Sequence, residues 1–145
     1  MFQIIDEFMK EHGTKYSRSK ISSLNIKFEN ILKKYNFLYE TEFKISYIND
    51  KFHKCYKFYD FHILNTNLLI EVNGDYWHAN PKIYKENDKF QFPKTQLTAK
   101  DIWKLDEYKN DIAKVNNYRV IYVWENELEN VSELEIVQKI KDSIN

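Results

Sequence analysis

Cysteine, glycine, proline and arginine are all scarce in this chain of 145 residues. The single cysteine, Cys55, excludes an intrachain disulfide and a cysteine-rich zinc site, and it favours a reducing, cytoplasmic location. No apolar run approaches the roughly 20 residues that a membrane-spanning helix needs. Asp6 and Glu7 interrupt the apolar residues at the N-terminus, so we expect neither a membrane span nor a signal peptide.

An excess of charge of one sign is also missing, because 22 basic residues balance 22 acidic ones. A strongly basic composition is the usual footprint of a nucleic-acid-binding protein, so here any such binding depends on where the lysines lie. By contrast, 43% of the residues are hydrophobic and 17% are aromatic, which excludes disorder. The length indicates a single domain, residues 1–145, with an N-terminal extension over residues 1–19.

Hydrophobic periodicity predicts an α/β domain with a mixed sheet of about four strands flanked by helices. The expected helices span residues 20–36, 99–116 and 132–144, and the expected strands span residues 38–48, 52–63, 68–73 and 118–124. The first three strands form an antiparallel meander, and a helix crossover leads to a fourth strand parallel to the third. The last strand is almost continuously apolar, which predicts a central position buried on both faces. Val115 and Leu134 are expected in the apolar stripes of their helices.

Residues 59–80 hold most of the side chains that suggest chemistry. Two apolar runs flank a polar break, and a two-residue turn at residues 65–66 places Asp60 opposite Glu71. Directly opposed Cβ atoms lie ~5 Å apart, and Asn73 shares the face of Glu71. Two opposed carboxylates repel unless a counter-charge lies between them, and magnesium prefers such hard oxygen ligands. The alternative is a solvated sheet face on which both acids point into water.

A histidine follows this acid pair. Gly74 permits a sharp exit from the strand, and Tyr76 and Trp77 then precede His78. Beside a metal-bound carboxylate pair, an imidazole with a pKa near neutrality suits a general acid or base. The alternative is a half-buried histidine under an aromatic cluster.

Residues 79–98 lack periodicity and contain both prolines, which predicts a long loop or lid. Lysines for phosphates and aromatic rings for stacking suit DNA, whereas ordinary surface lysines on a mobile loop are the alternative. The candidate DNA contacts are Lys82, Lys85, Lys89 and Lys94, with Tyr76 and Trp77 before them and Tyr84, Phe90 and Phe92 between them.

Three pieces of the chain resemble one known group of nucleases. They are YDF at residues 59–61, LLIEVNGDYWHANP at residues 68–81 and KNDIAKVNNYRVIYVWENEL at residues 109–128. These pieces are similar to the very-short-patch mismatch-repair endonucleases and the phage homing endonucleases related to them, within the PD-(D/E)XK superfamily. The resemblance covers roughly residues 20–130, is most specific around Trp77 and His78, and implies a restriction-endonuclease-like core.

The resemblance also implies a set of site residues. It implies Mg²⁺ (or Mn²⁺) bound by Asp60 and by either the Glu71 carboxylate or the Val72 carbonyl. Further candidates for the catalytic site are Asn73, His78, Asp106, Lys109 and Glu29. The chain departs from the family where Asn25 replaces the usual acid of the first helix, where Asn73 replaces an aspartate, histidine or lysine, and where the zinc-site cysteines are missing. Glu29, one turn beyond Asn25, is either a substitute acid or a surface residue.

These features favour a metal-dependent DNA endonuclease, in a homing, phage or mismatch-repair role. Asp60 would bind the metal, His78 would transfer a proton, and Lys109 would stabilise phosphate charge. The alternative is a catalytically decayed DNA-binding module of the same fold, and a protein-interaction domain is a third reading. DNA is the expected partner, together with either a second copy of the chain or a separate targeting protein. The abundance of lysine, asparagine, isoleucine and tyrosine suggests an AT-rich genome, such as that of a phage in a bacterial host.

Overall fold

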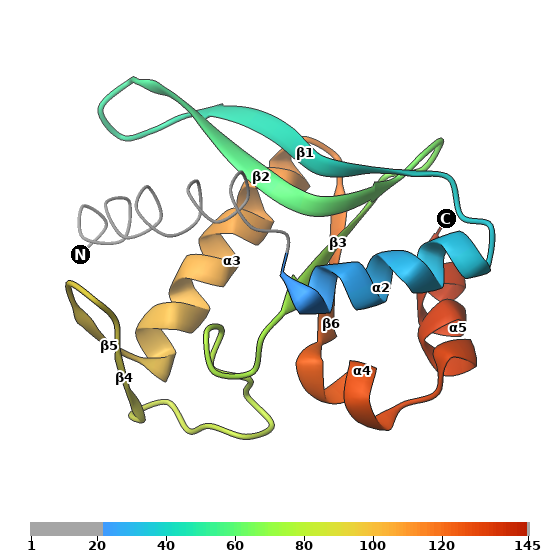
Figure 1. Ribbon diagram of the computed structural model, residues 1–145. Helices are drawn as coiled ribbons and strands as arrows, with labels where there is room; N and C mark the ends of the chain where they lie inside the picture. The colour runs from blue at the N-terminus through green and yellow to red at the C-terminus, as the bar shows by residue number, and fades with distance from the viewer. Residues whose placement is uncertain (1–21, 145) are drawn as a thin grey trace.

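The computed structural model describes residues 22–144, so the predicted extension over residues 1–19 lies outside the described part (Figure 1). It is an α/β structure in which a four-stranded mixed sheet is flanked by helices, as predicted. The elements are α2 (Ser23–Lys34), β1 (Tyr39–Ile48), β2 (Lys54–Ile63), β3 (Leu68–Asn73), β4 (Lys89–Gln91), β5 (Gln96–Thr98), α3 (Ala99–Val115), β6 (Arg119–Trp124), α4 (Glu125–Asn130) and α5 (Glu133–Ser143).

Hydroxyl side chains fix where three of the helices begin. Ser22, Thr98 and Ser132 each accept a hydrogen bond from the backbone N–H three residues further on, which satisfies a free donor of the first turn. Thr98 and Asp101 form a full capping box at the start of α3. No helix within residues 22–144 has both the length and the apolar character needed to cross a membrane.

The strand order in the sheet is β1-β2-β3-β6. β1, β2 and β3 pair antiparallel, and β6 pairs parallel with β3 after the crossover through α3. All six residues of β3 are buried, whereas β6 is an edge strand on which Tyr122 and Trp124 remain partly exposed. The predicted central position of residues 118–124 is therefore wrong, because large aromatic side chains at a sheet edge give the same apolar run as a central strand.

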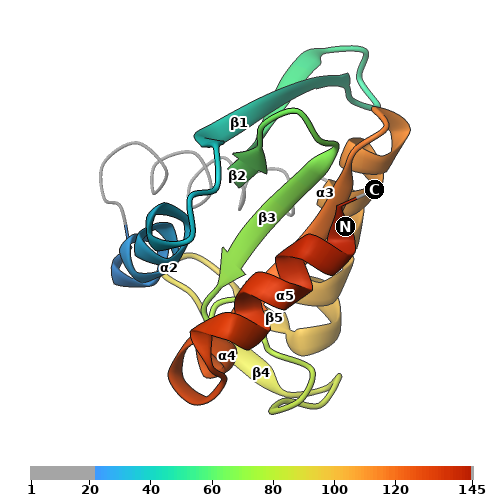
Figure 2. The same cartoon turned by 90° about the vertical axis from the view of Figure 1, so that its right-hand side faces the viewer.

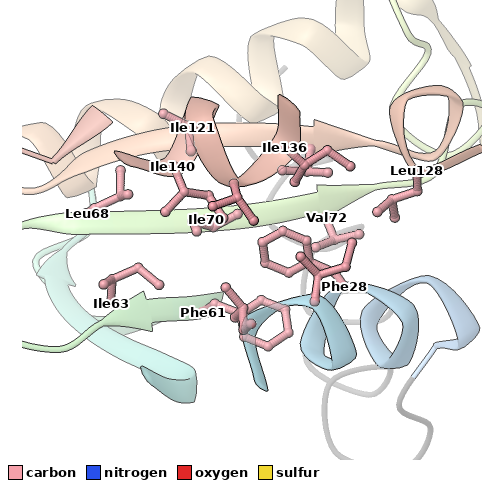
Figure 3. Packing of buried hydrophobic residues seen from close by; sticks show 14 residues of the cluster. Phe28, Phe61, Ile63, Leu68, Ile70, Val72, Ile121, Leu128, Ile136 and Ile140 are labelled. Carbon is pink, nitrogen blue, oxygen red and sulfur yellow. The ribbon is translucent and has the colours of Figure 1, made fainter. Parts of the chain in front are cut away.

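The helices bury apolar side chains on both faces of the sheet. On one face, residues of α2, α4 and α5 form the cluster shown in Figure 3, where Phe28 and Phe61 meet edge to face at 5.2 Å. On the other face, α3 packs on β1, β2 and β3. Figure 1 shows α3 and α5 on opposite sides of β3 and β6, and in the turned view of Figure 2 α5 lies nearer the viewer than α3. Val115 and Leu134 are 82% and 67% exposed, so their predicted core positions are wrong. Both occupy the terminal turn of their helix.

Residues 79–98 are more ordered than the predicted loop or lid. β4 and β5 form a two-stranded hairpin beside the start of α3. Phe90 and Phe92 are each 1% exposed and pack with Leu97, Ile102 and Leu105 in a core cluster of their own. These two phenylalanines are therefore unavailable for stacking on bases, because the hairpin uses them to fix itself to α3.

Candidate active site

Asp60 and Glu71 meet where β2 and β3 separate. The observed pairs Phe61 with Ile70 and His62 with Leu69 have the predicted register, which places Asp60 opposite Glu71. Backbone pairing ends there and side chains replace it. The N–H of Asp60 donates to Glu71 Oε1 at 2.8 Å, and the N–H of Val72 donates to Asp60 Oδ2 at 2.8 Å. Each carboxylate is therefore fixed by a backbone donor of the opposite strand.

The backbone of β2 changes its facing at Asp60. Tyr59 packs in the cluster under α3, whereas Phe61, two residues later, lies in the cluster on the other face of the sheet. A regular strand would keep both on one face. In β1, Glu42 at the corresponding register position has a φ of 51°. This irregularity directs the Asp60 side chain toward β3.

Lys109 supplies the positive charge that the acid pair requires. Its Nζ lies 2.6 Å from Glu71 Oε2 and 4.8 Å from the centroid of the Tyr59 ring. The Tyr59 hydroxyl donates to the Lys109 carbonyl at 2.6 Å, which holds this turn of α3 against β2. Burial disfavours the charged amine, yet Glu71 and Asp60 raise the pKa of Lys109 above its ordinary value. Lys109, a predicted site residue, therefore lies against the acid pair and provides one counter-charge for it.

One lysine does not neutralise the pair fully. Burial is the largest cause that raises the pKa of Asp60, and repulsion from Glu71 adds to it. Lys109, the Val72 N–H and a hydrogen bond with the Asn25 side chain act in the opposite direction, and the resulting pKa is about 7. Burial and the neighbouring acid thus both disfavour the charged form of Asp60, and a bound proton or a further cation at this position would offset both.

His78 and Asp106 form a second pair beside the first. His78 Nδ1 lies 3.2 Å from both carboxylate oxygens of Asp106, which precedes Lys109 by three residues and so shares its face of α3. Burial lowers the pKa of His78, but Asp106 and Glu71 outweigh it and the pKa is raised. The His78 side chain is 34% exposed. No hydrogen-bond partner of Nε2 lies among the described residues. Because no fully buried side-chain nitrogen or oxygen there lacks a partner, Nε2 keeps some exposure to solvent.

The two remaining predicted catalytic residues, Asn73 and Glu29, lie in different places. Asn73 is 2% exposed and follows Glu71 by two residues in β3. Glu29 lies outside the cluster, since its carboxylate is 3.4 Å from Lys33 and hydrogen-bonds with Tyr39. Asn25, which sequence comparison treats only as a departure from a family acid, is the α2 residue that contacts Asp60. Asn25 lies three residues before the buried Phe28, and this helical spacing was the signal that Asn25 lies on the inner side of α2.

Hydrogen bonds shape the turn that carries His78. Gly74 does not have a positive φ, so the exit from β3 does not depend on a left-handed backbone conformation there. Instead, the His78 N–H donates to the Gly74 carbonyl at 3.2 Å, and Asn80 donates to Asp75 Oδ1 at 2.9 Å. The Trp103 indole on α3 donates to the Ala79 carbonyl at 2.7 Å. These bonds fix the turn to itself and to α3.

An exposed basic and aromatic surface lies beside this turn. Tyr76 and Trp77 are 44% and 47% exposed. Their ring centroids lie 6.4 and 5.4 Å from the ring centroid of the buried Phe92. The four predicted lysines are all exposed, namely Lys82, Lys85, Lys89 and Lys94. The structure therefore leaves the predicted lysines and the two residues before His78 accessible.

Two carboxylates of this site are the candidate ligands for a metal ion. Within residues 22–144, no group of three or more histidine, cysteine, aspartate or glutamate side chains is arranged to hold a metal. Asp60 and Glu71 nevertheless offer two adjacent carboxylates with excess negative charge. Mg²⁺ is usually bound through one or two carboxylates and keeps several waters. Val72 contributes its N–H to Asp60.

Comparison with known proteins adds little about activity. No protein-family model matches the sequence, and no curated protein matches it. Among solved structures, the catalytic domain of the homing endonuclease I-Bth0305I aligns over 83% of this chain and 92% of its own, with 17% sequence identity and a TM-score of 0.47. That similarity is too low to assign an activity, which must come from the geometry of the site.

Proposed function

We propose that this protein is a metal-dependent DNA endonuclease that uses Mg²⁺ or Mn²⁺. The observation that carries the proposal is the meeting of two pairs, Asp60–Glu71 with Lys109 and His78–Asp106, at the open end of the β2–β3 hairpin. The exposed lysines and aromatic residues beside them suit a polyanionic duplex. The sequence resemblance to very-short-patch and homing endonucleases supports the same assignment.

Each side chain has a role that follows from its contacts. Asp60 and Glu71 would hold the metal, which when bound supplies positive charge at the scissile phosphate and acidifies the attacking water. Lys109, fixed by Glu71 and Tyr59, places a permanent positive charge next to the phosphate and stabilises the charge that develops there.

His78 is the proton donor to the leaving oxygen. Asp106 holds Nδ1, so the accessible Nε2 carries the proton that is transferred. The raised pKa of His78 keeps a larger fraction of the ring protonated at neutral pH.

A catalytically decayed DNA-binding module is the second candidate. It is favoured by Lys109, which already neutralises Glu71, and by asparagine at positions 25 and 73, which cannot accept a proton from water. Such a module would bind duplex DNA in the presence of a chelator and cut nothing.

Cleavage of supercoiled plasmid separates the two functions. We expect nicked or linear product with Mg²⁺ or Mn²⁺, none with chelator, and at least a hundredfold loss of rate in Asp60→Asn, the order expected when a charge-stabilising group is removed. Glu107→Gln, at an exposed acid of α3, is the control and should cut at the wild-type rate. Unchanged cleavage by Asp60→Asn would exclude this site, and binding without cleavage under every metal would establish the module.

A further inference from the structure

The β1–β2 hairpin ends in an exposed phenylalanine. β2 pairs with β3 only at Phe61 and His62, whereas β1 and β2 pair with each other as far as Ile48 and Lys54. The far half of the hairpin consequently extends beyond the sheet, as Figure 1 shows. Phe52 lies at its tip, is 89% exposed and has a φ of 60°, a left-handed conformation that is unfavourable for an aromatic residue. Folding gains nothing from this placement.

Asn49 makes the tip rigid. Its side-chain oxygen accepts hydrogen bonds from the N–H groups of Lys51 and His53, both at 2.9 Å. Its backbone accepts from the Phe52 N–H at 3.0 Å and donates to the His53 carbonyl at 2.9 Å. The phenyl ring is therefore presented on a turn that is already ordered, which reduces the entropy lost on binding.

The hairpin is also more basic than the chain as a whole. Residues 44–57 contain four lysines and a single acidic residue, although the whole chain has no net charge. Lys44 and Lys54 lie 4.6 and 5.8 Å from the centroid of the Tyr56 ring, and all three side chains are exposed. An apolar wedge between lysines matches the surface by which proteins unstack or kink duplex DNA.

We propose that the β1–β2 hairpin is a second DNA contact, in which Phe52 inserts against the base stack and Lys44, Lys51 and Lys54 bind the flanking phosphates. The partner rests on the proposed function. Phe52 is eight residues from Asp60 along the chain, so the two lie roughly 25 Å apart. With the hairpin lying along the duplex axis, at 3.4 Å per base pair, Phe52 would contact the duplex about seven base pairs from the scissile phosphate.

Binding measured in the Asp60→Asn background tests the hairpin without cleavage. Fluorescence anisotropy with a labelled duplex should show about 5- to 100-fold weaker binding after Phe52→Ala, the range expected for loss of one stacked ring. Phe52→Trp should retain affinity. Leu134→Ala, at another exposed apolar residue on α5, is the matched control. A 2-aminopurine placed about seven base pairs from the cut should brighten on binding, and this signal should vanish with Phe52→Ala.

The outcomes distinguish the hairpin from the active site. Equal binding by Phe52→Ala and Leu134→Ala, or an unchanged 2-aminopurine signal, overturns the hairpin contact even if the wild type cuts plasmid. Conversely, if Asp60→Asn still cuts plasmid, the proposed site fails, and a Phe52-dependent loss of binding continues to support the hairpin. If no variant, including the parent, binds duplex DNA, the hairpin contact and the nuclease fail together.

Discussion

Replacing Asp60 by asparagine should stabilise the protein while it abolishes cleavage. The substitution keeps the side-chain shape, and the amide oxygen can still accept from the Val72 N–H. It removes one of two adjacent negative charges that share one lysine. Protein sites that concentrate like charge for chemistry do so at the expense of stability. A position with a purely structural carboxylate would respond in the opposite direction.

The size of this stabilisation and its pH dependence follow from the pKa of Asp60. It is about 7 in the folded protein and 3.8 when unperturbed, so between these values the folded state keeps a proton that the unfolded state has lost. The free energy of unfolding therefore falls as pH rises through this window, and the loss is complete above the folded pKa. At 1.36 kcal/mol per pKa unit, we predict that Asp60→Asn is more stable than wild type by roughly 2–4 kcal/mol at pH 8. Below the unperturbed value the two proteins should be equally stable.

Urea unfolding in chelator provides the measurement. The difference in unfolding free energy between wild type and Asp60→Asn should be near zero at pH 4 and should grow through neutrality. Added Mg²⁺ should narrow the difference at pH 8, because a bound cation stabilises only the protein that keeps both carboxylates. A variant less stable than wild type at pH 8 would refute the excess of negative charge, as would a difference that does not change with pH.

Two further predictions concern the partners of this pair. Lys109→Met removes the lysine that contacts Glu71 and should cost about 3–5 kcal/mol at pH 7 in urea unfolding. Added Mn²⁺ should recover more stability in this variant than in wild type. Lys104→Met, on the exposed side of α3, should cost little, and an equal loss would argue against a specific role for Lys109. The cleavage rate should fall as pH rises above the raised pKa of His78, because the Nε2 proton is then lost. His78→Gln should cut slowly, and its cleavage rate should not fall as pH rises. If the rate still falls in this variant, the pH dependence belongs to another group.

The placement of Asp60 opposite Glu71 could be predicted from the local sequence, because it depends on one turn. Alternating apolar residues on both sides of residues 65–66 allow one register that buries both strands, and that register places Asp60 opposite Glu71. The strands themselves also follow from local alternation, and the parallel pairing of the last strand follows from the helix that precedes it. The structure has both features. The sequence could not reveal that β6 lies at an edge, because strand order depends on the whole sheet.

Two features depend on contacts between distant segments. They are the contact of Lys109 with Glu71 and the burial of the β4–β5 hairpin against α3. Lys109 reaches Glu71 across 38 residues because α3 crosses back over the sheet, a distance that periodicity does not encode. Phe90 and Phe92 alternate with charged and polar residues as exposed stacking residues would, yet packing against α3 buries them. The sequence likewise did not predict that Phe52 is exposed at the tip of its hairpin, because the exposure of one aromatic residue leaves no mark on a strand pattern.

The position of bound Mn²⁺ tests the central claim most directly. Crystals of the wild-type protein grown with Mn²⁺, at a concentration that supports cleavage, should give an anomalous scattering peak in contact with the carboxylates of Asp60 and Glu71. The same experiment on Asp60→Asn should lose the peak. Mn²⁺ bound elsewhere, or no peak in a protein that cuts DNA under those conditions, would contradict the assignment of these two acids as the catalytic metal site.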